Sequence, residues 1–372
     1  MKLAGIRVLD LSVFLPGPYL TRTLADHGAE VIKVEAPPEG DPGRNIGPSQ
    51  GSSTVFFRNL NRGKKSIALN LKDAADQAVL LDLCATADIF VESFRPGVAE
   101  RLGIGYEAVR ARNSRIIYCS ITAFGQFGPY RDRAAHDLAV EALSGVLSVT
   151  QGRDGQPAIP GIPVADYMSA MQGLAGVLMA LHRRHDTGQG DYIDISMHDA
   201  MASACANILG PTLAEDRQPV ARHERTTGGS ALYQIYATRD GGHICLAGQE
   251  LKFARALLEA LGRPDFIELC ARGPGPHQQP VESFLRETFL QRTRDDWVEW
   301  LGKLDVCFGS LKTLPEALRD EQLLARGMVQ KDALGRRHLA SPIRFGAEPA
   351  QIDYREPALD ANRAEILKSL RP

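Results

Sequence analysis

The chain has few cysteines, few aromatic residues and almost no net charge. Its 372 residues include six cysteines that form no Cys-x-x-Cys pair, so we expect reduced thiols rather than a disulfide framework. Basic and acidic residues nearly balance, 43 against 45, which is unlike the basic surface of nucleic-acid-binding proteins. Hydrophobic residues make up 44% and charged residues 24%, as in ordinary globular proteins.

Long apolar runs are also missing. The most apolar run, residues 171–181, is shorter than the ~20 residues that a membrane span needs. Residues 1–5 lack the apolar core of a signal peptide. We therefore expect a cytoplasmic protein with no membrane partner and no nucleic-acid partner. At roughly 150 residues per domain, the length predicts one large and one smaller domain.

The first 125 residues alternate between apolar, β-branched runs and helical segments. Strands are predicted at 6–11, 30–35, 66–71, 88–94 and 115–122, and helices at 18–28 and 73–87. Strands that are apolar at nearly every position and separated by helices are typical of a parallel sheet covered on both faces. The stretch 37–65, rich in Gly, Pro and Ser, is expected to be a long loop.

The pattern changes in the second half. Helices are predicted at 137–147, 167–185 and 198–210, with a strand at 191–196. Two β runs, 232–238 and 243–247, then flank Asp240-Gly241-Gly242, which is a hairpin signal, and three helices follow. We therefore expect a large α/β domain (1–210), a linker (211–224), a smaller α+β domain (225–320) and a C-terminal return to the large domain (321–372).

Three motif matches are better explained by local structure than by chemistry. Residues 47–51 match G-x-S-x-G but lack the strand and helix of a nucleophile elbow. Residues 103–108 match G-x-G-x-x-A but follow a predicted helix rather than a strand. His182 and His185 lie near a helix end, where cations are favourable, and two ligands make no metal site. No metal is expected.

Two neighbouring segments do carry candidate chemistry. Asp166 follows a Gly/Pro loop and begins an apolar helix, so it is predicted to be the N-cap. Backbone N–H groups there would keep the carboxylate ionised, ready to act as nucleophile or base, although a purely structural cap has the same position. His136 and Asp137 begin another helix. Asp137 is predicted to cap it at Leu138, and His136 is an acid/base candidate beside Asp166.

These features occur within a longer series of segments. In chain order they are Val8-Leu9-Asp10, Pro16-Gly17-Pro18, residues 28–35 (GAEVIKVE), Gly40-Asp41, residues 61–66 (NRGKKS), residues 91–97 (VESFRPG), residues 125–130 (GQFGPY), residues 187–191 (TGQGD) and residues 194–197 (DISM). With these segments the chain resembles the class III CoA-transferase (CaiB/BaiF) family over nearly its whole length. That family includes formyl-CoA and carnitine CoA-transferases and also α-methylacyl-CoA racemases.

The resemblance implies a fold and an activity. It implies a Rossmann-like parallel sheet that binds CoA, a smaller α+β domain, and two subunits interlocked as a homodimer. Asp166 matches the catalytic aspartate. In the transferases this residue forms a mixed anhydride with the acyl group and then an aspartyl-CoA thioester. The implied substrates are an acyl-CoA and a carboxylic acid, with no tightly bound cofactor.

This sequence matches only some of the positions that contact CoA in the family. Phe14, Leu69, Lys72, Arg95 and Arg101 match them, and Lys and Arg suit the phosphates of CoA. The basic residue that often follows the second strand in the family is replaced by Ala36. Its role in phosphate binding is expected to pass to Arg44 or Arg62.

Two activities within the family remain open. His136 matches the racemase histidine, and Gly228-Gly229-Ser230 also resembles the racemases. Glu250 matches a racemase carboxylate that pairs with the Asp–His element, so the resemblance implies that Glu250 pairs with His136. A racemase would use His136 and Asp166 as two bases on either side of the α-carbon. The glycine-rich run that follows the aspartate in racemases is absent, because Tyr167-Met168-Ser169-Ala170 stands there. We therefore favour CoA transfer, with racemisation as the alternative. A non-catalytic CoA-binding subunit conflicts with the intact Asp166. An NAD-dependent enzyme conflicts with the absence of a glycine-rich dinucleotide-binding fingerprint after the first predicted strand.

Overall fold

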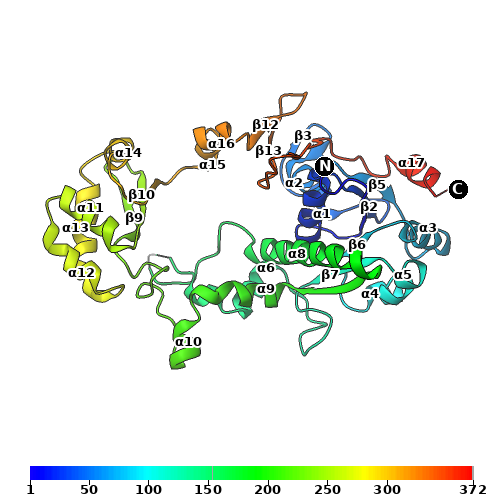
Figure 1. Cartoon of the computed structure of the whole chain (residues 1–372), viewed down its shortest axis with the longest axis horizontal. Helices are drawn as coiled ribbons and strands as arrows, with labels where there is room; N and C mark the ends of the chain where they lie inside the picture. The colour runs from blue at the N-terminus through cyan, green and yellow to red at the C-terminus, as the bar shows by residue number, and fades with distance from the viewer. Residues whose placement is uncertain (153, 371–372) are drawn as a thin grey trace. The chain divides into compact units, whose positions relative to one another are not determined.

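The computed structural model describes residues 1–152 and 154–370 (Figure 1). They form two compact units. Unit 1 comprises residues 1–144, 161–203 and 321–372, and unit 2 comprises residues 145–160 and 204–320. Unit 1 thus includes the C-terminal segment. Unit 2 begins earlier than the expected small domain and also takes 145–160, which the sequence pattern assigns to the large domain.

Unit 1 is built on one sheet of six parallel strands. Their order is β5 (Lys65–Ala68), β2 (Glu30–Glu35), β1 (Arg7–Asp10), β6 (Ile89–Glu92), β7 (Ile117–Thr122) and β8 (Asp191–Ser196). The parallel α/β fold predicted from the sequence is confirmed. The strand order reverses between β1 and β6, and the carboxyl ends of strands at such a switch point are where open α/β sheets bind ligands.

Helices cover both faces of this sheet, because successive strand side chains point to opposite sides. Leu9 and Phe90 share a buried cluster with α3 (Ala74–Cys84), α5 (Tyr106–Arg112) and α17 (Arg363–Lys368). The other face packs against α1 (Pro16–Asp26) and α8 (Val164–Thr187). There a Cβ on Gly173 would lie 2.8 Å from Leu20 Cδ1 and 3.4 Å from Ile121 Cδ1.

α8 is longer than the apolar run in the sequence indicates. Its 24 residues are enough, by length and composition alone, to cross a membrane. Core helices of soluble proteins pass the same test. Ala170 and Val177 of α8 are fully buried inside the fold, and the helix packs on α1, β7 and β8. α8 therefore packs one face on the sheet of unit 1 and leaves Met171, Leu178 and Met179 exposed.

Several local expectations differ from the structure. The expected loop 37–65 contains the helix α2 (Val55–Asn61), the short strands β3 (Ser49–Gln50) and β4 (Ser53–Thr54), and a 3₁₀ turn. The expected helix 137–147 is broken into α6 (Asp137–Leu143) and α7 (Val146–Val149) by Gly145, whose φ is +88°. The strand expected at 66–71 ends at Ala68, so the next residues turn away from the sheet.

Unit 2 is an α+β unit around an antiparallel sheet. The predicted hairpin is confirmed as β9 (Tyr233–Ala237) and β10 (His243–Ala247), and β11 (Phe308–Ser310) pairs with β10. Its core includes α11 (Leu251–Ala260), α13 (Gln279–Phe289) and α14 (Arg294–Leu301), and the buried indole N–H of Trp297 donates to Phe289 O at 2.8 Å. The remaining helices and strands are α4 (Val98–Arg101), α9 (Met197–Ala204), α10 (Gly210–Glu215), α12 (Ile267–Ala271), α15 (Leu314–Ala317), α16 (Glu321–Ala325), β12 (Val329–Lys331) and β13 (Arg337–Leu339).

Candidate active site

Asp166 lies in the first turn of α8, but not at its N-cap. The helix begins at Val164 with Pro163 as N-cap, so Asp166 is the third helical residue. The N–H groups of Ala165 and Asp166 donate to Asp137 Oδ1 at 2.8 and 3.2 Å. The prediction that Asp166 caps this helix is therefore wrong. The cap comes from a residue 29 positions earlier in the chain.

Two carboxylates of α6 together cap α8. Glu141 Oε1 accepts a hydrogen bond from Val164 N–H at 3.1 Å, beside the two bonds accepted by Asp137. Residues four apart lie on the same side of a helix, which is why both can reach α8. We call Asp137 and Glu141 the carboxylate clasp. The expectation that Asp137 caps its own helix is also wrong, because α6 begins at Asp137 and His136 is its N-cap.

The Asp166 carboxylate lies in an unfavourable place for a negative charge. It is partly buried, and it accepts no hydrogen bond from residues 1–152 or 154–370. Burial, followed by the charges of Asp137 and Glu141, raises the pKa of Asp166 to about 7. The helix N-terminus does not keep this group ionised as expected, because the clasp occupies the N–H groups. At neutral pH, Asp166 exchanges between acid and carboxylate.

His136 and Phe14 lie next to each other. His136 is exposed, and its ring meets the edge of Phe14 with the centroids 5.9 Å apart. Phe14 has a φ of +63°, which is unusual for a bulky side chain and is a mark of constrained functional loops. Its N–H donates to Asp41 Oδ1 at 3.4 Å. The loop after β1 is thus tied both to α6 and to the segment that follows β2.

A cavity opens at the carboxyl ends of β1, β2 and β5. It has a volume of about 350 Å³ and is largely apolar. Its lining includes Leu69 and Lys72, two of the residues expected to contact CoA, together with Leu71, Phe94 and Leu102. These residues come from the segments that follow β5 and β6. Because β5 stops at Ala68, Leu69 to Lys72 form the cavity wall instead of continuing the sheet.

Lys72 lines this cavity, and Arg95 and Arg101 are each next to a lining residue in the chain. Lys72, Arg95 and Arg101 are exposed, and none of their side chains makes an ion pair or hydrogen bond within the described part of the chain. Arg101 Nη1 and Arg131 Nη2 lie 3.3 and 3.4 Å from the position a Cβ would take on Gly97. Unpaired guanidinium and ammonium groups beside an apolar cavity suit a ligand that joins a flat apolar body to phosphates.

Neither Arg44 nor Arg62 takes over from the basic residue that Ala36 replaces. Arg44 donates from Nε and Nη2 to both oxygens of Glu35, at 2.8 and 2.7 Å. Arg62 is buried and donates from Nε and Nη2 to Asp26 at 3.2 and 2.8 Å. The expectation that either one binds phosphate is therefore wrong, since both guanidinium groups are committed to carboxylates inside the fold.

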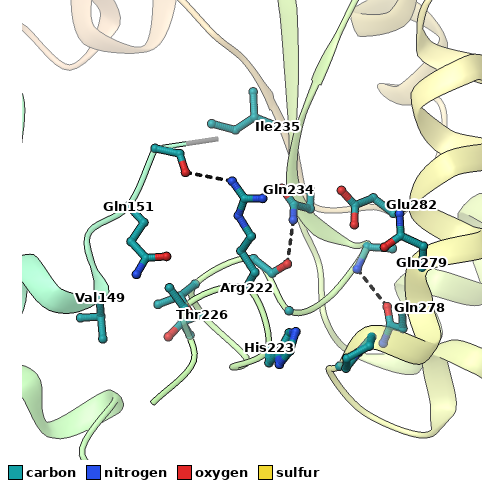
Figure 2. Close-up of a pocket in the computed structure, with 18 of the residues that line it drawn as sticks. Val149, Gln151, Arg222, His223, Thr226, Gln234, Ile235, Gln278, Gln279 and Glu282 are labelled. Carbon is teal, nitrogen blue, oxygen red and sulfur yellow. Dashed lines mark hydrogen bonds between the residues drawn. The ribbon is translucent and has the colours of Figure 1, made fainter. Parts of the chain in front are cut away.

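A second, larger cavity lies within unit 2 and has a volume of about 780 Å³ (Figure 2). Gly228 and Gly229 form part of its wall. Gly228 has a φ of +97°, and a Cβ on Gly229 would lie 2.4 Å from the carbonyl carbon of His223, so the turn requires glycine. Across the cavity, Arg222 Nη2 donates to Gly152 O at 2.9 Å, and Gln234 Nε2 donates to Gly228 O at 2.7 Å.

Glu250 also belongs to unit 2. It is the N-cap residue of α11, and its side chain is exposed and makes no cap hydrogen bond. It lies outside the residues that line the cavity of Figure 2. Its pairing with His136 stays a prediction.

The weak motifs behave as structural features. Ser49 is exposed in the short hairpin of β3 and β4. Gly103 takes a φ of +68° in a turn, and Gly105 is the N-cap of α5. His185 Nδ1 lies 3.4 Å from Asp186 Oδ1 on the surface. The part of the chain that the structure describes holds no group of three or more His, Cys, Asp or Glu side chains that could bind a metal.

Comparison with known proteins identifies the class of the chain. Residues 3–363 match the model of CoA-transferase family III. The chain belongs to this family and is a class III CoA-transferase. It is 30% identical to succinyl-CoA:glutarate CoA-transferase of Mus musculus over 99% of this chain and 86% of the relative. It is 34% identical to acetyl-CoA:oxalate CoA-transferase of Acetobacter aceti over 88% and 85% of the two chains.

A solved structure agrees in fold. The crystal structure of a CaiB/BaiF family protein from Brucella suis superposes with a TM-score of 0.88 at 32% identity and covers 100% of both chains.

Two residues near the site escaped the sequence reasoning. Glu141 follows Asp137 by four positions, and this spacing on a predicted helix was the available signal. Arg131 follows the Gly-Pro-Tyr run and gave no signal, since its approach to Gly97 depends on two separate loops.

Proposed function

We propose that this protein moves CoA between carboxylic acids through a covalent adduct on Asp166. The observation that carries the proposal is the Asp166 carboxylate itself. It is partly buried at the start of α8, it accepts no hydrogen bond from the residues that the structure describes, and its pKa is raised to about 7. A carboxylate with a raised pKa is more basic and more nucleophilic than an ordinary aspartate. A purely structural aspartate at this position would accept backbone hydrogen bonds.

The proposed reaction proceeds by acyl substitutions. An Asp166 oxygen attacks the thioester carbonyl carbon, the C–S bond breaks, and CoA leaves as thiolate. The thiolate then attacks the Asp166 carbonyl of the mixed anhydride and releases the first acid as a carboxylate. The resulting aspartyl-CoA thioester is attacked by the second carboxylate, and the same steps run in reverse. Charge is conserved because each substitution exchanges one anion for another.

We assign the cavity at the carboxyl ends of β1, β2 and β5 to CoA. Leu69 and the neighbouring apolar residues suit the adenine end, and Lys72, Arg95 and Arg101 suit the phosphates. Phe14 lies between this cavity and α6, because it follows the lining residue Val13 and touches His136. The CoA chain would pass Phe14 on its way to Asp166.

We propose short dicarboxylic acids as the acyl donors and acceptors. Three similar enzymes are named for such acids: succinyl-CoA and glutarate in one, oxalate in another, D-citramalate in a third. The second carboxylate of such an acid needs a cation or several polar donors.

One mass-spectrometry assay tests the proposal. The protein is incubated in D2O with succinyl-CoA and glutarate or oxalate, and both the acyl-CoA products and the α-deuterium content are measured. We expect new acyl-CoA without α-deuteration, and an adduct of CoA mass on the wild-type chain. Asp166→Asn should lose both. Asp186→Asn, at the exposed far end of the same helix, should keep them.

The other outcomes identify the alternatives. Rapid α-deuteration without transfer, lost in His136→Ala, would overturn the proposal in favour of racemisation. Transfer that survives in Asp166→Asn would remove the covalent mechanism. Glu250→Gln tests the proposed pairing of Glu250 with His136, since an unchanged turnover would end that idea.

A further inference from the structure

Glu141 is the least expected group in the site. It is fully buried, and its Oε1 accepts the hydrogen bond from Val164 N–H. Its Oε2 is also buried and has no hydrogen-bond partner in the described part of the chain. A buried oxygen without a donor is costly for a carboxylate. The cost disappears if this oxygen carries a proton and donates it to a neighbouring acceptor.

That acceptor is the other half of the clasp. Burial and the Asp137 carboxylate raise the pKa of Glu141. A proton on Glu141 would form an O–H···O bond to Asp137, while Glu141 Oε1 still accepts from Val164 N–H. Asp166 also sits beside this pair, and its pKa rises for the same reasons. Three carboxyl groups at one helix N-terminus cannot all be ionised without strong repulsion.

The other charged and titratable groups around Asp166 do not relieve this repulsion. From α1, Tyr19 and Arg22 approach Tyr167, the residue after Asp166. Arg22 is committed elsewhere: its guanidinium lies 4.5 Å from the Tyr19 ring, and its Nε lies 3.8 Å from Asp26 Oδ2. The raised pKa of Asp166 has no opposing contribution from a cation. The charge of Asp166 is therefore governed by the clasp.

We propose that Glu141 is a positioning residue that competes with Asp166 for a single proton. When the proton is on Asp166, the acid cannot attack a thioester. When it moves to Glu141, the Asp137–Glu141 bond forms, and Asp166 becomes the nucleophilic carboxylate. The transfer is internal, so the net charge of the site does not change. The inference rests on the proposed function, because it concerns the ionisation of the same nucleophile.

Glu141→Gln separates this role from the capping role. The amide oxygen can still accept from Val164 N–H, and the amide N–H can donate to Asp137, so the variant imitates the protonated glutamate permanently. We expect the apparent pKa for adduct formation to fall by about one unit, since one competing acid is removed. A fall of one unit from about 7 makes the variant about fivefold faster than wild type at pH 6. Above pH 8 it should be slightly slower, because a less basic carboxylate attacks less well.

The measurement is the rate of CoA-adduct formation on the chain, followed by rapid quenching and intact mass from pH 5.5 to 9. Ratios of variant to wild type cancel the titration of CoA itself. Glu107→Gln, on the exposed start of α5, is the matched control and should follow wild type. Asp137→Asn keeps an acceptor for Ala165 N–H and should shift the profile in the same direction. If Glu141→Gln does not fold, Asp137→Asn still tests the proposal.

The two failures look different. If wild type forms an adduct on Asp166 and both variants keep its pH profile, the proton competition is overturned. A uniform loss of rate at every pH, without a shift, overturns it as well, since that is what a purely structural role produces. If wild type forms no adduct at all, the proposed function fails first.

Discussion

Asp166 is a residue whose charge opposes folding, because its native environment favours the protonated form. Its pKa is about 7 in the fold against the ordinary 3.8 of an unfolded chain. Below about pH 4 both states hold the proton, so the group has no effect on stability. Between pH 4 and 7 only the native state holds it, and stability falls as pH rises. Above 7 the full penalty is present.

Asp166→Asn should therefore stabilise the fold while abolishing CoA transfer. The full shift would correspond to about 4 kcal/mol, and partial exposure of the group reduces our expectation to about 2 kcal/mol. Thermal unfolding at pH 8 should show a higher Tm for the variant, with the gain shrinking as pH falls and reaching zero only below about pH 4. A lower Tm at pH 8 would mean that the carboxylate is a structural group.

Arg101 is the residue that best tests the CoA site. It is exposed and unpaired within the described residues, and with Arg131 it converges on Gly97. Arg101→Gln should raise the KM for acyl-CoA about tenfold, the equivalent of ~1.4 kcal/mol, and leave kcat nearly unchanged. A thioester of 3′-dephospho-CoA shows which phosphate Arg101 contacts. If Arg101 contacts the 3′-phosphate, wild type and variant should have the same KM for this thioester. The control is Arg112→Gln, because Arg112 already pairs with Asp82. Equal KM values for Arg101→Gln and wild type would refute the assignment.

At the scale of elements, the turn from α8 into β8 depends on two glycines. Gly188 ends α8 in the left-handed conformation, with a φ of +68°. Gly190 approaches β7 so closely that a Cβ would lie 1.8 Å from the Ile116 carbonyl oxygen. This contact is with backbone, which cannot move aside as a side chain could. The two glycines explain part of the segment 187–191 in physical terms.

Gly190→Ala should displace β8 from the sheet. Because the clash is with backbone, we expect a loss of at least about 3 kcal/mol and a chain that is mostly insoluble. Gly210→Ala, where nothing lies within 4 Å of the added Cβ, is the matched control and should keep its stability. Solubility on expression and urea unfolding measure the difference. A Gly190→Ala chain as stable as wild type would show that β8 can shift without loss.

The elements that were predictable from sequence are those with a local signal. The strands at 30–35 and 115–122 are rich in β-branched residues, and the hairpin at 233–247 has its glycines in the turn. α2 was missed because Pro, Gly and Ser residues on its N-terminal side outweighed seven helical residues. The N-cap of α8 was placed three residues too late, at Asp166 instead of Pro163, because this helix is capped from α6. A cap that comes from 29 residues away leaves no pattern near the helix itself.

At the scale of the whole molecule, the chain leaves unit 1 between the carboxylate clasp on α6 and the start of α8. Glu141 and Val164 share a hydrogen bond, yet residues 145–160 between them belong to unit 2. Residues 149–152 of this excursion line the cavity in unit 2. Unit 2 is thus connected covalently to both α6 and α8, immediately beside the groups that control Asp166.

Unit 1 also exposes an apolar surface that a second copy of the chain would cover. The exposed apolar side chains on α6 and α8, and on the loop before α8, are Leu138, Leu143, Ile162, Met171, Leu178 and Met179. α6 and α8 contact each other, so these side chains lie on neighbouring elements, and large exposed apolar surfaces mark interaction sites. The homodimer implied by the family resemblance gives it a partner, and it stays a prediction.

Light scattering after size exclusion should therefore give about 81 kDa, twice the chain mass of 40.5 kDa. Met179 is 67% exposed, so Met179→Glu costs the folded chain almost nothing but places a charge in the proposed interface. We expect this variant to dissociate at micromolar concentration with its far-ultraviolet spectrum unchanged. Glu107→Gln, far from α8 in sequence and fully on the surface of α5, should remain dimeric. A wild-type monomer, or a Met179→Glu dimer as tight as wild type, would remove this face from the interface.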